Sequence, residues 1–283
     1  MNLCKIVFHI ANQNYRKWIT NYRIWILFII LAIFVRNYTQ EIMNFAELMN
    51  LKSSPWLFPF LTGQNYSKIF IFIGILLLFC DAPFIDKSQP YLIIRSGRRK
   101  WCTGQIIYVF GATLFYFAFM LILSILLNIN HLEYNSDWGK VIGTIGNGLA
   151  LDFASRNVSI NWTVINYFTP ITAMFYSYLL LSLGGIFIGM ILFFTNILTE
   201  NKVFGFIIAS FFVFLEFIGK LFPKILWISP ISWVDLNNID LDGISGKPNI
   251  TYILVMFSIL ISALIIGSII AVKRKEIEVN AEI

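Results

Sequence analysis

Charged residues are scarce in this sequence. Asp, Glu, Lys and Arg make up only 13% of the 283 residues, whereas about 25% is usual for a soluble domain. A water-soluble fold of this length needs more charged surface than 21 basic and 15 acidic residues provide. This scarcity excludes a soluble enzyme and a disordered chain, and it excludes a nucleic-acid binder despite the net charge of +6.

Cysteine and histidine are also few, and the sequence lacks a phosphate-binding loop. The three cysteines do not have metal-ligand spacing, and the two histidines stand too far apart to form a metal cluster. The nearest approximation to a nucleotide-binding glycine loop, at residues 243–248, has the wrong spacing and a proline where a hydroxyl is needed. We therefore expect no catalytic residue, no metal and no cofactor in this chain, and we expect that the chain itself is not an enzyme.

Apolar residues, in contrast, make up 58% of the sequence and fall into long runs. A bilayer core of about 30 Å requires roughly 20 mostly apolar residues per helix. The runs predict an all-α integral membrane protein, with residues 1–283 forming a single transmembrane domain in the lipid bilayer. The first, second and fifth predicted spans are short or interrupted. Six transmembrane helices are expected, near residues 18–35, 67–84, 102–128, 169–195, 203–222 and 251–272.

The distribution of Lys and Arg predicts which side of the membrane each segment faces. The densest basic groups lie at residues 95–100 and 273–275, directly beside strong spans. Because short basic loops stay in the cytoplasm, both termini are expected to be cytoplasmic. Residues 1–17 are too polar to span, but their apolar residues recur at helical spacing, which predicts an interfacial helix. The alternative is an ordinary basic flank to the first span.

Two segments are expected to be prominent on the outer side. Residues 129–168 form the longest outer loop, and residues 221–250 are apolar but broken by Pro223 and Pro230. Because a proline-broken stretch cannot form a clean span, we expect a short re-entrant or interfacial helical hairpin on the outer side after the fifth span. No internal repeat is visible in the sequence, so an inverted-repeat secondary transporter is not supported.

A few polar or small residues inside the spans are candidates for a specific role. Glu216 and Lys220 stand four residues apart with the acid first, which favours an intramembrane ion pair over a proton relay. Gly185 and Gly189 form a small-xxx-small motif, which favours close helix packing within the chain or between subunits. Asp81, near the cytoplasmic end of its span, is expected to form an ion pair with the basic cluster that ends at Lys100.

The segment 81–110 is the most informative part of the sequence. It leaves one span, passes Pro83 and Pro90, continues through a short apolar run at 91–94 and enters the next span through a basic cluster. This pattern predicts a short cytoplasmic helix of a size that fits a groove on a soluble partner. The positive-inside rule by itself accounts for the basic residues of this segment.

The same segment resembles the first cytoplasmic loop of small permease subunits of type-2 ABC transporters, in particular six-span bacterial members of the Firmicute kind. The overall layout is similar as well, with an interfacial helix, a proline-broken outer hairpin and a basic C-terminal tail. The long outer loop departs from the simplest members of this family. The residues that carry the resemblance are Pro83, Phe84, Asp86, Arg95, Gly97, Arg98, Trp101, Gly104 and Gln105.

The resemblance implies a permease half that pairs with a second permease subunit, identical or related, in the bacterial cell membrane. Two copies of a cytoplasmic ABC ATPase subunit, which would hold ATP and magnesium, would drive export of peptides, antibiotics or other amphipathic compounds. Residues 85–100 would form the coupling loop that docks on the ATPase. The coupling residues implied in this way are Asp86, Gln89, Pro90, Tyr91, Arg95, Gly97, Arg98, Arg99 and Trp101.

Two other classes of protein are alternatives to this one. A partner-independent membrane immunity or channel protein would bind a toxin or peptide through its outer loops, and the long loop at 129–168 keeps this class open. A membrane-embedded enzyme is disfavoured because it requires clustered catalytic residues inside the bilayer, which two distant histidines and unpaired acids do not provide.

Overall fold

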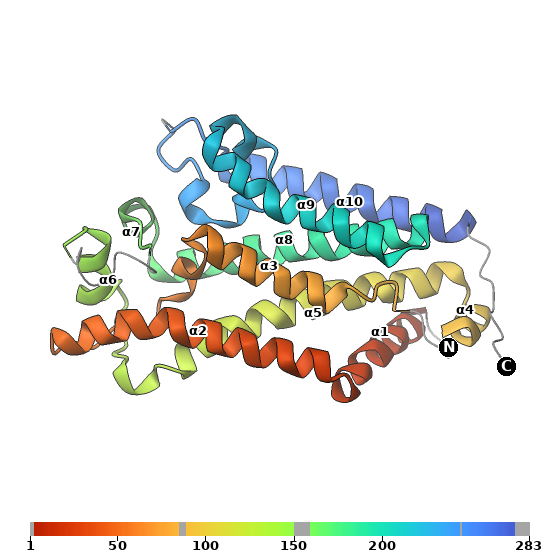
Figure 1. The fold of residues 1–283 in the computed structure, drawn as a ribbon, viewed down its shortest axis with the longest axis horizontal. Coiled ribbons are helices and arrows are strands. Elements are labelled where there is room, and N and C mark those ends of the chain that lie inside the picture. Colours follow the sequence, from red (N-terminus) through yellow and green to blue (C-terminus); the bar gives the residue numbers. More distant parts are fainter. Residues whose placement is uncertain (1–2, 85–88, 150–158, 244, 275–283) are drawn as a thin grey trace.

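The computed structural model describes residues 3–84, 89–149, 159–243 and 245–274, and this part of the chain is helical, without a β-strand. The all-α prediction is therefore confirmed. Long helices lie side by side along the molecule (Figure 1). They are α2 (Tyr22–Leu48), α3 (Asn65–Phe79), α5 (Arg98–Leu126), α8 (Pro170–Thr199), α9 (Lys202–Leu221) and α10 (Ile250–Arg274).

Five of these helices, α2, α5, α8, α9 and α10, are long and apolar enough to cross a membrane. The remaining one, α3, has 15 residues, which corresponds to about 22 Å of helix and is shorter than the bilayer core. Its apolar sequence nevertheless packs along α8 and α9.

The centre of the bundle is α8, which packs against α3, α5, α9 and α10. Of its most apolar stretch 78% is buried inside the protein, compared with 22% for α10. Gly185 and Gly189 lie on faces of α8 that contact other helices of the same chain. A Cβ at Gly185 would meet Thr113 of α5, and one at Gly189 would meet Val109 of α5 and Phe79 of α3.

The N-terminal region differs in its boundaries from the prediction. Helix α1 (Leu3–Thr20) extends past residue 17, and the first long helix begins at Tyr22 and not at residue 18. The break falls at Asn21, whose side chain accepts a hydrogen bond from the Arg23 backbone N–H and caps α2. Helix α2 also continues to Leu48, well past the predicted end at residue 35, because it keeps a buried apolar face to its end.

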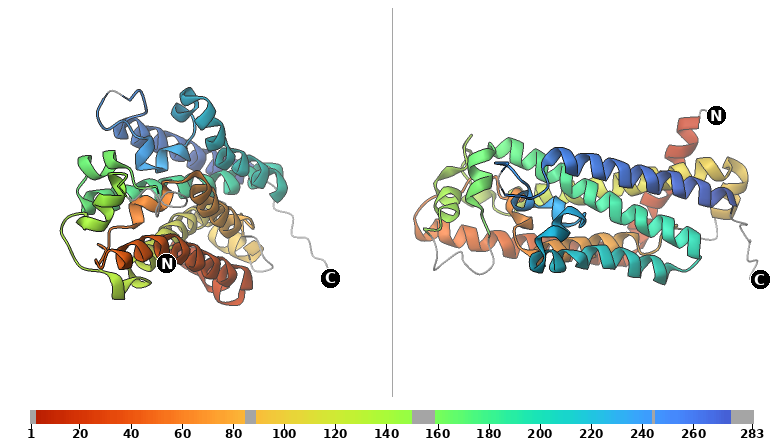
Figure 2. Two further views of the ribbon diagram at one scale, coloured as in Figure 1. Left: turned by 60° about the vertical axis from the view of Figure 1, so that its left-hand side comes forward. Right: turned by 90° about the horizontal axis from the view of Figure 1, so that it is seen from above.

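The short elements gather at the two ends of the bundle. Helix α1, helix α4 (Gln89–Ser96) and the end of α10 lie at one end, and α1 crosses the bundle axis there (Figures 1 and 2). At the opposite end lie α6 (Gly139–Gly146) and α7 (Trp162–Tyr167), within the predicted long outer loop (Figure 1). The 3-10 turns Phe58–Thr62 and Ile129–His131 connect elements on this side, where Ser53 and Leu132 form an isolated β-bridge.

The proline-broken segment after α9 forms three 3-10 turns and not a helical hairpin. These turns are η3 (Pro223–Trp227), η4 (Ser232–Val234) and η5 (Leu236–Asn238). The segment is anchored by Trp233, which is fully buried and donates a hydrogen bond to the Leu226 carbonyl at 2.6 Å. The prolines prevent continuous helix, and the indole fixes the path of the chain against α8.

Candidate functional site

Helix α4 is attached to the bundle by a chain of buried side-chain amides. The Trp101 indole N–H donates to Gln89 Oε1 at 2.6 Å, and Gln105 Nε2 donates to the same oxygen at 3.4 Å. Asn14 Nδ2 donates in turn to Gln105 Oε1 at 2.5 Å. Hydrogen bonds are stronger in such a low-dielectric interior than in water. The chain therefore joins α1, α4 and α5 into one unit.

The opposite face of α4 is exposed and combines apolar with basic side chains. Tyr91 is 72% exposed and Ile94 is 76% exposed, and Arg95 is exposed beside them. Arg98 and Arg99 at the start of α5 extend this surface. We call the surface formed by these five residues the α4 surface. Large apolar side chains in such exposed positions are typical of an interaction site.

A sharp corner separates α4 from α5. Gly97 has φ +86°, a conformation that favours glycine, and its N–H donates to the Ile93 carbonyl at 2.8 Å. The Arg98 guanidinium donates to the backbone carbonyl of Lys273 at 3.2 Å, so the corner also contacts the end of α10. The corner places the basic residues of α5 directly beside the exposed side chains of α4.

The nine coupling residues implied by the resemblance differ in burial. Gln89 and Trp101 are buried and position α4, so they do not belong to its outer surface. Pro90 is half-buried, and Asp86 lies outside the described residues. The other five are exposed at this end of the bundle: Tyr91, Arg95, Gly97, Arg98 and Arg99.

A buried ionic cluster at the other end was missed by the sequence analysis. Lys68 of α3 forms ion pairs with Glu216 of α9 and with Asp235, at 2.8 Å from its Nζ to Asp235 Oδ2. The side chains of these three residues are only 1–3% exposed. The available signal was a lone lysine at the start of an apolar helix, which needs a counter-ion when buried. The predicted pairing of Glu216 with Lys220 stays a prediction because the Lys220 side chain is outside the described part.

The ionic cluster fixes the segment after α9 to the helices. Asp235 accepts from Lys68 and also accepts from the Asn237 backbone N–H through its Oδ1 at 3.0 Å, which caps η5. Through Glu216 the same ammonium contacts α9. One lysine therefore joins α3, α9 and the 3-10 segment.

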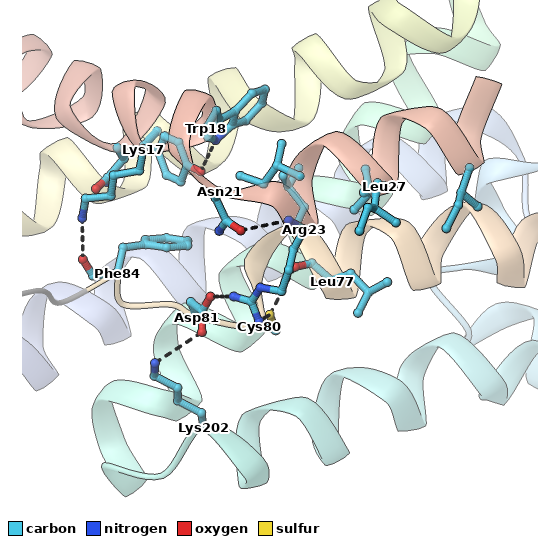
Figure 3. A pocket seen from close by; sticks show the side chains of 16 residues that line it. Lys17, Trp18, Asn21, Arg23, Leu27, Leu77, Cys80, Asp81, Phe84 and Lys202 are labelled. Atoms are coloured by element: carbon cyan, nitrogen blue, oxygen red, sulfur yellow. Dashed lines mark hydrogen bonds and ion pairs between the residues drawn. The ribbon is translucent and has the colours of Figure 1, made fainter.

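Asp81 has different ion-pair partners from those expected. Its carboxylate pairs with Arg23 at the start of α2 and, at 3.5 Å, with Lys202 at the start of α9, and not with the cluster that ends at Lys100. The ends of α2, α3 and α9 meet at this level, where a pocket of about 480 Å³ opens (Figure 3). Lys17 of α1 also lines this pocket and donates to the Phe84 carbonyl at 3.1 Å.

In the described ranges, no group of three or more His, Cys, Asp or Glu residues is arranged to hold a metal ion. Neither the exposed α4 surface nor the ionic cluster contains a nucleophile paired with a base. The arrangement of α4 supports recognition of a partner, and that of the cluster supports attachment of a loop.

An all-helical bundle with five apolar helices of membrane-crossing length defines the class: this is a multi-pass membrane protein. Neither models of known protein families nor curated proteins match the chain. A more specific assignment has to come from the geometry of the molecule.

Proposed function

We propose that the chain is the transmembrane permease subunit of an ATP-driven ABC exporter, which moves peptides, antibiotics or other amphipathic compounds out of the cell. The observation that carries the proposal is the α4 surface. It presents Tyr91, Ile94 and Arg95 at the end of the bundle, on a helix whose buried face is bonded to α5 and, through Gln105 of α5, to α1. Exposed apolar and basic side chains on a firmly attached helix fit docking into a groove of a soluble partner.

In this proposal six helices cross the bacterial cell membrane, with α3 as the short sixth span. Successive long helices alternate in direction along the bundle, α3 included (Figure 1). The α4 end faces the cytoplasm, because Arg95, Arg98, Arg99 and Lys100 gather there. Both chain termini are then cytoplasmic, and α1 lies in the inner membrane interface.

The partners are two copies of a cytoplasmic ABC ATPase subunit and a second permease subunit, identical or related. ATP and magnesium are held by the ATPase. When the ATPase subunits close on ATP, their movement pushes α4. The bonds of Gln89 with Trp101 and Gln105 pass this displacement to α5, and the bond between Gln105 and Asn14 passes it to α1. Helix α5 packs against the central α8. A path for the cargo opens between the two permease halves.

Co-purification tests the proposal. The tagged chain is expressed with ATPase subunits from its own genome and purified in mild detergent, and bound subunits are identified by mass. We expect a stoichiometric ATPase to co-purify with the unmodified chain. Tyr91→Ala and Arg95→Ala should each weaken its binding by roughly tenfold. Tyr134→Ala is the matched control, because Tyr134 is 77% exposed but lies outside α4, in the predicted outer loop.

Recovery of the chain alone, folded and monodisperse, would contradict the proposal that it is a permease subunit. That result would favour the alternative, a partner-independent immunity or channel protein that binds a toxin or peptide through its outer loops.

A further inference from the structure

The pocket beside Asp81 has a basic end. Arg23 and Lys202 line it and share the carboxylate of Asp81, which is the acidic side chain among its described lining residues. These two cations and one anion leave one net positive charge in the group. Arg23 of α2 and Lys202 of α9 point toward Asp81, in the turn after α3, whereas Lys17 of α1 points toward the Phe84 carbonyl (Figure 3).

The charged groups are accessible from outside. The side chains of Arg23 and Lys202 are 50% and 56% exposed, and that of Asp81 is 44% exposed. A guanidinium has five N–H donors and an ammonium has three. The one carboxylate that Arg23 and Lys202 share therefore leaves them able to bind a further anion.

The other end of the pocket is apolar. Ile26 and Ile30 of α2 and Leu77 of α3 line it, and all three are exposed large apolar side chains. They lie farther from the ends of α2 and α3 than Arg23 and Asp81 do, so they lie toward the bilayer centre when these helices cross the membrane. The pocket thus has charged groups at the membrane interface and an apolar wall on the side toward the bilayer centre.

We propose that this pocket binds an anionic phospholipid of the inner leaflet. The phosphate lies beside Arg23 and Lys202, and one acyl chain lies along Ile26, Ile30 and Leu77. Charge complementarity selects the anionic headgroup over a neutral one, because each basic side chain near the membrane surface favours anionic lipid. The volume of about 480 Å³ lies within the usual range of small-molecule sites, roughly 300–1,000 Å³. The assignment to the inner leaflet rests on the proposed topology, but the binding itself does not require the proposed transport function.

Native mass spectrometry of the purified full-length chain tests the proposal. The chain is incubated with phosphatidylglycerol or with phosphatidylcholine of identical acyl chains, and the bound lipid is counted. We expect preferential retention of phosphatidylglycerol, and we expect Arg23→Ala/Lys202→Ala to lower this retention by roughly tenfold. Arg23→Lys/Lys202→Arg should keep it. The control Lys52→Ala/Lys140→Ala removes two exposed lysines that do not line the pocket and should also keep it.

Filling the apolar wall provides a test that leaves the charges intact. Leu77→Trp should reduce phosphatidylglycerol binding with no change in charge. Equal retention of the two lipids by the unmodified chain would overturn the proposal without any variant. So would displacement of the lipid by glycerol 3-phosphate at concentrations similar to those of phosphatidylglycerol, because that result would show a site for free phosphate esters and not for a lipid.

Discussion

At the scale of single residues, Lys68 shows what a charge requires inside an apolar helix. Its ammonium lies between the carboxylates of Glu216 and Asp235, with all three side chains almost fully buried. Removing one member of such a cluster leaves the others desolvated and unbalanced, which costs more than the net contribution of the intact pairs.

We therefore predict that Lys68→Met lowers the free energy of unfolding by about 3–5 kcal/mol, because two carboxylates then stay buried without their cation. Thermal unfolding in detergent, followed by tryptophan fluorescence, measures the loss. Lys52→Met removes an exposed lysine and should leave the midpoint unchanged. Equal midpoints for both variants would show that the cluster does not hold the fold together.

The Trp101 indole is the second residue with a defined role, since it attaches α4 through Gln89. Trp101→Phe keeps an aromatic ring but removes the donor, so we predict a local loss of about 1 kcal/mol. Hydrogen exchange should become faster in residues 89–96 and stay unchanged in α8. Trp162→Phe, at an exposed tryptophan, is the control. Unchanged exchange in α4 would mean that the amide chain does not hold this helix.

At the scale of the elements, close packing of α8 depends on glycines. A Cβ at Gly185 would lie 2.6 Å from Thr113 Cγ2 and 2.8 Å from Phe117 Cε2. We predict that Gly185→Ala destabilises the protein by about 1–3 kcal/mol through overpacking. Gly143→Ala is the matched control, because a Cβ there meets no described atom within 4 Å and alanine favours helix. If both substitutions shift the unfolding midpoint alike, α8 is not packed as described.

The same scale shows which elements the sequence could predict. Helices α8 and α10 agree with the predicted spans within a few residues, because hydropathy alone marks a long apolar run. The prediction ended α2 too early. Beyond Arg36 only one face of the helix is apolar, so the mean hydropathy of that part is as low as that of a loop. The expected hairpin became 3-10 turns because Pro223 and Pro230 prevent continuous helix.

The candidate sites were harder to predict than the spans. The Asp235 that pairs with Lys68 stands 167 residues away in sequence, and the hydrogen-bonded Asn14 and Gln105 stand 91 apart. Contacts of this kind depend on helix packing, which a single sequence does not reveal. The exposed helix at 89–96 was predictable because its short apolar run lies between a proline and a basic cluster.

At the scale of the whole molecule, the bundle has two chemically different ends. The α4 end carries clustered arginines, and the opposite end carries α6 and α7 (Figure 1). We predict that a cysteine at position 134 reacts with a membrane-impermeant maleimide in intact cells, and that one at position 94 reacts only after permeabilisation. Both are introduced after the native cysteines are replaced. The reverse labelling pattern would show that the chain has the opposite orientation in the membrane and would contradict this prediction.

The central claim is that α4 contacts an ATP-hydrolysing partner. The most direct measurement replaces Ile94 with a photo-crosslinking amino acid in cells and identifies the captured protein, with Tyr134 replaced in the same way for comparison. We predict a cross-link from position 94 to an ABC ATPase subunit, lost on adding Tyr91→Ala, and none to that subunit from position 134. Capture of no ATPase at position 94, in a chain that is folded and inserted in the membrane, would contradict the account.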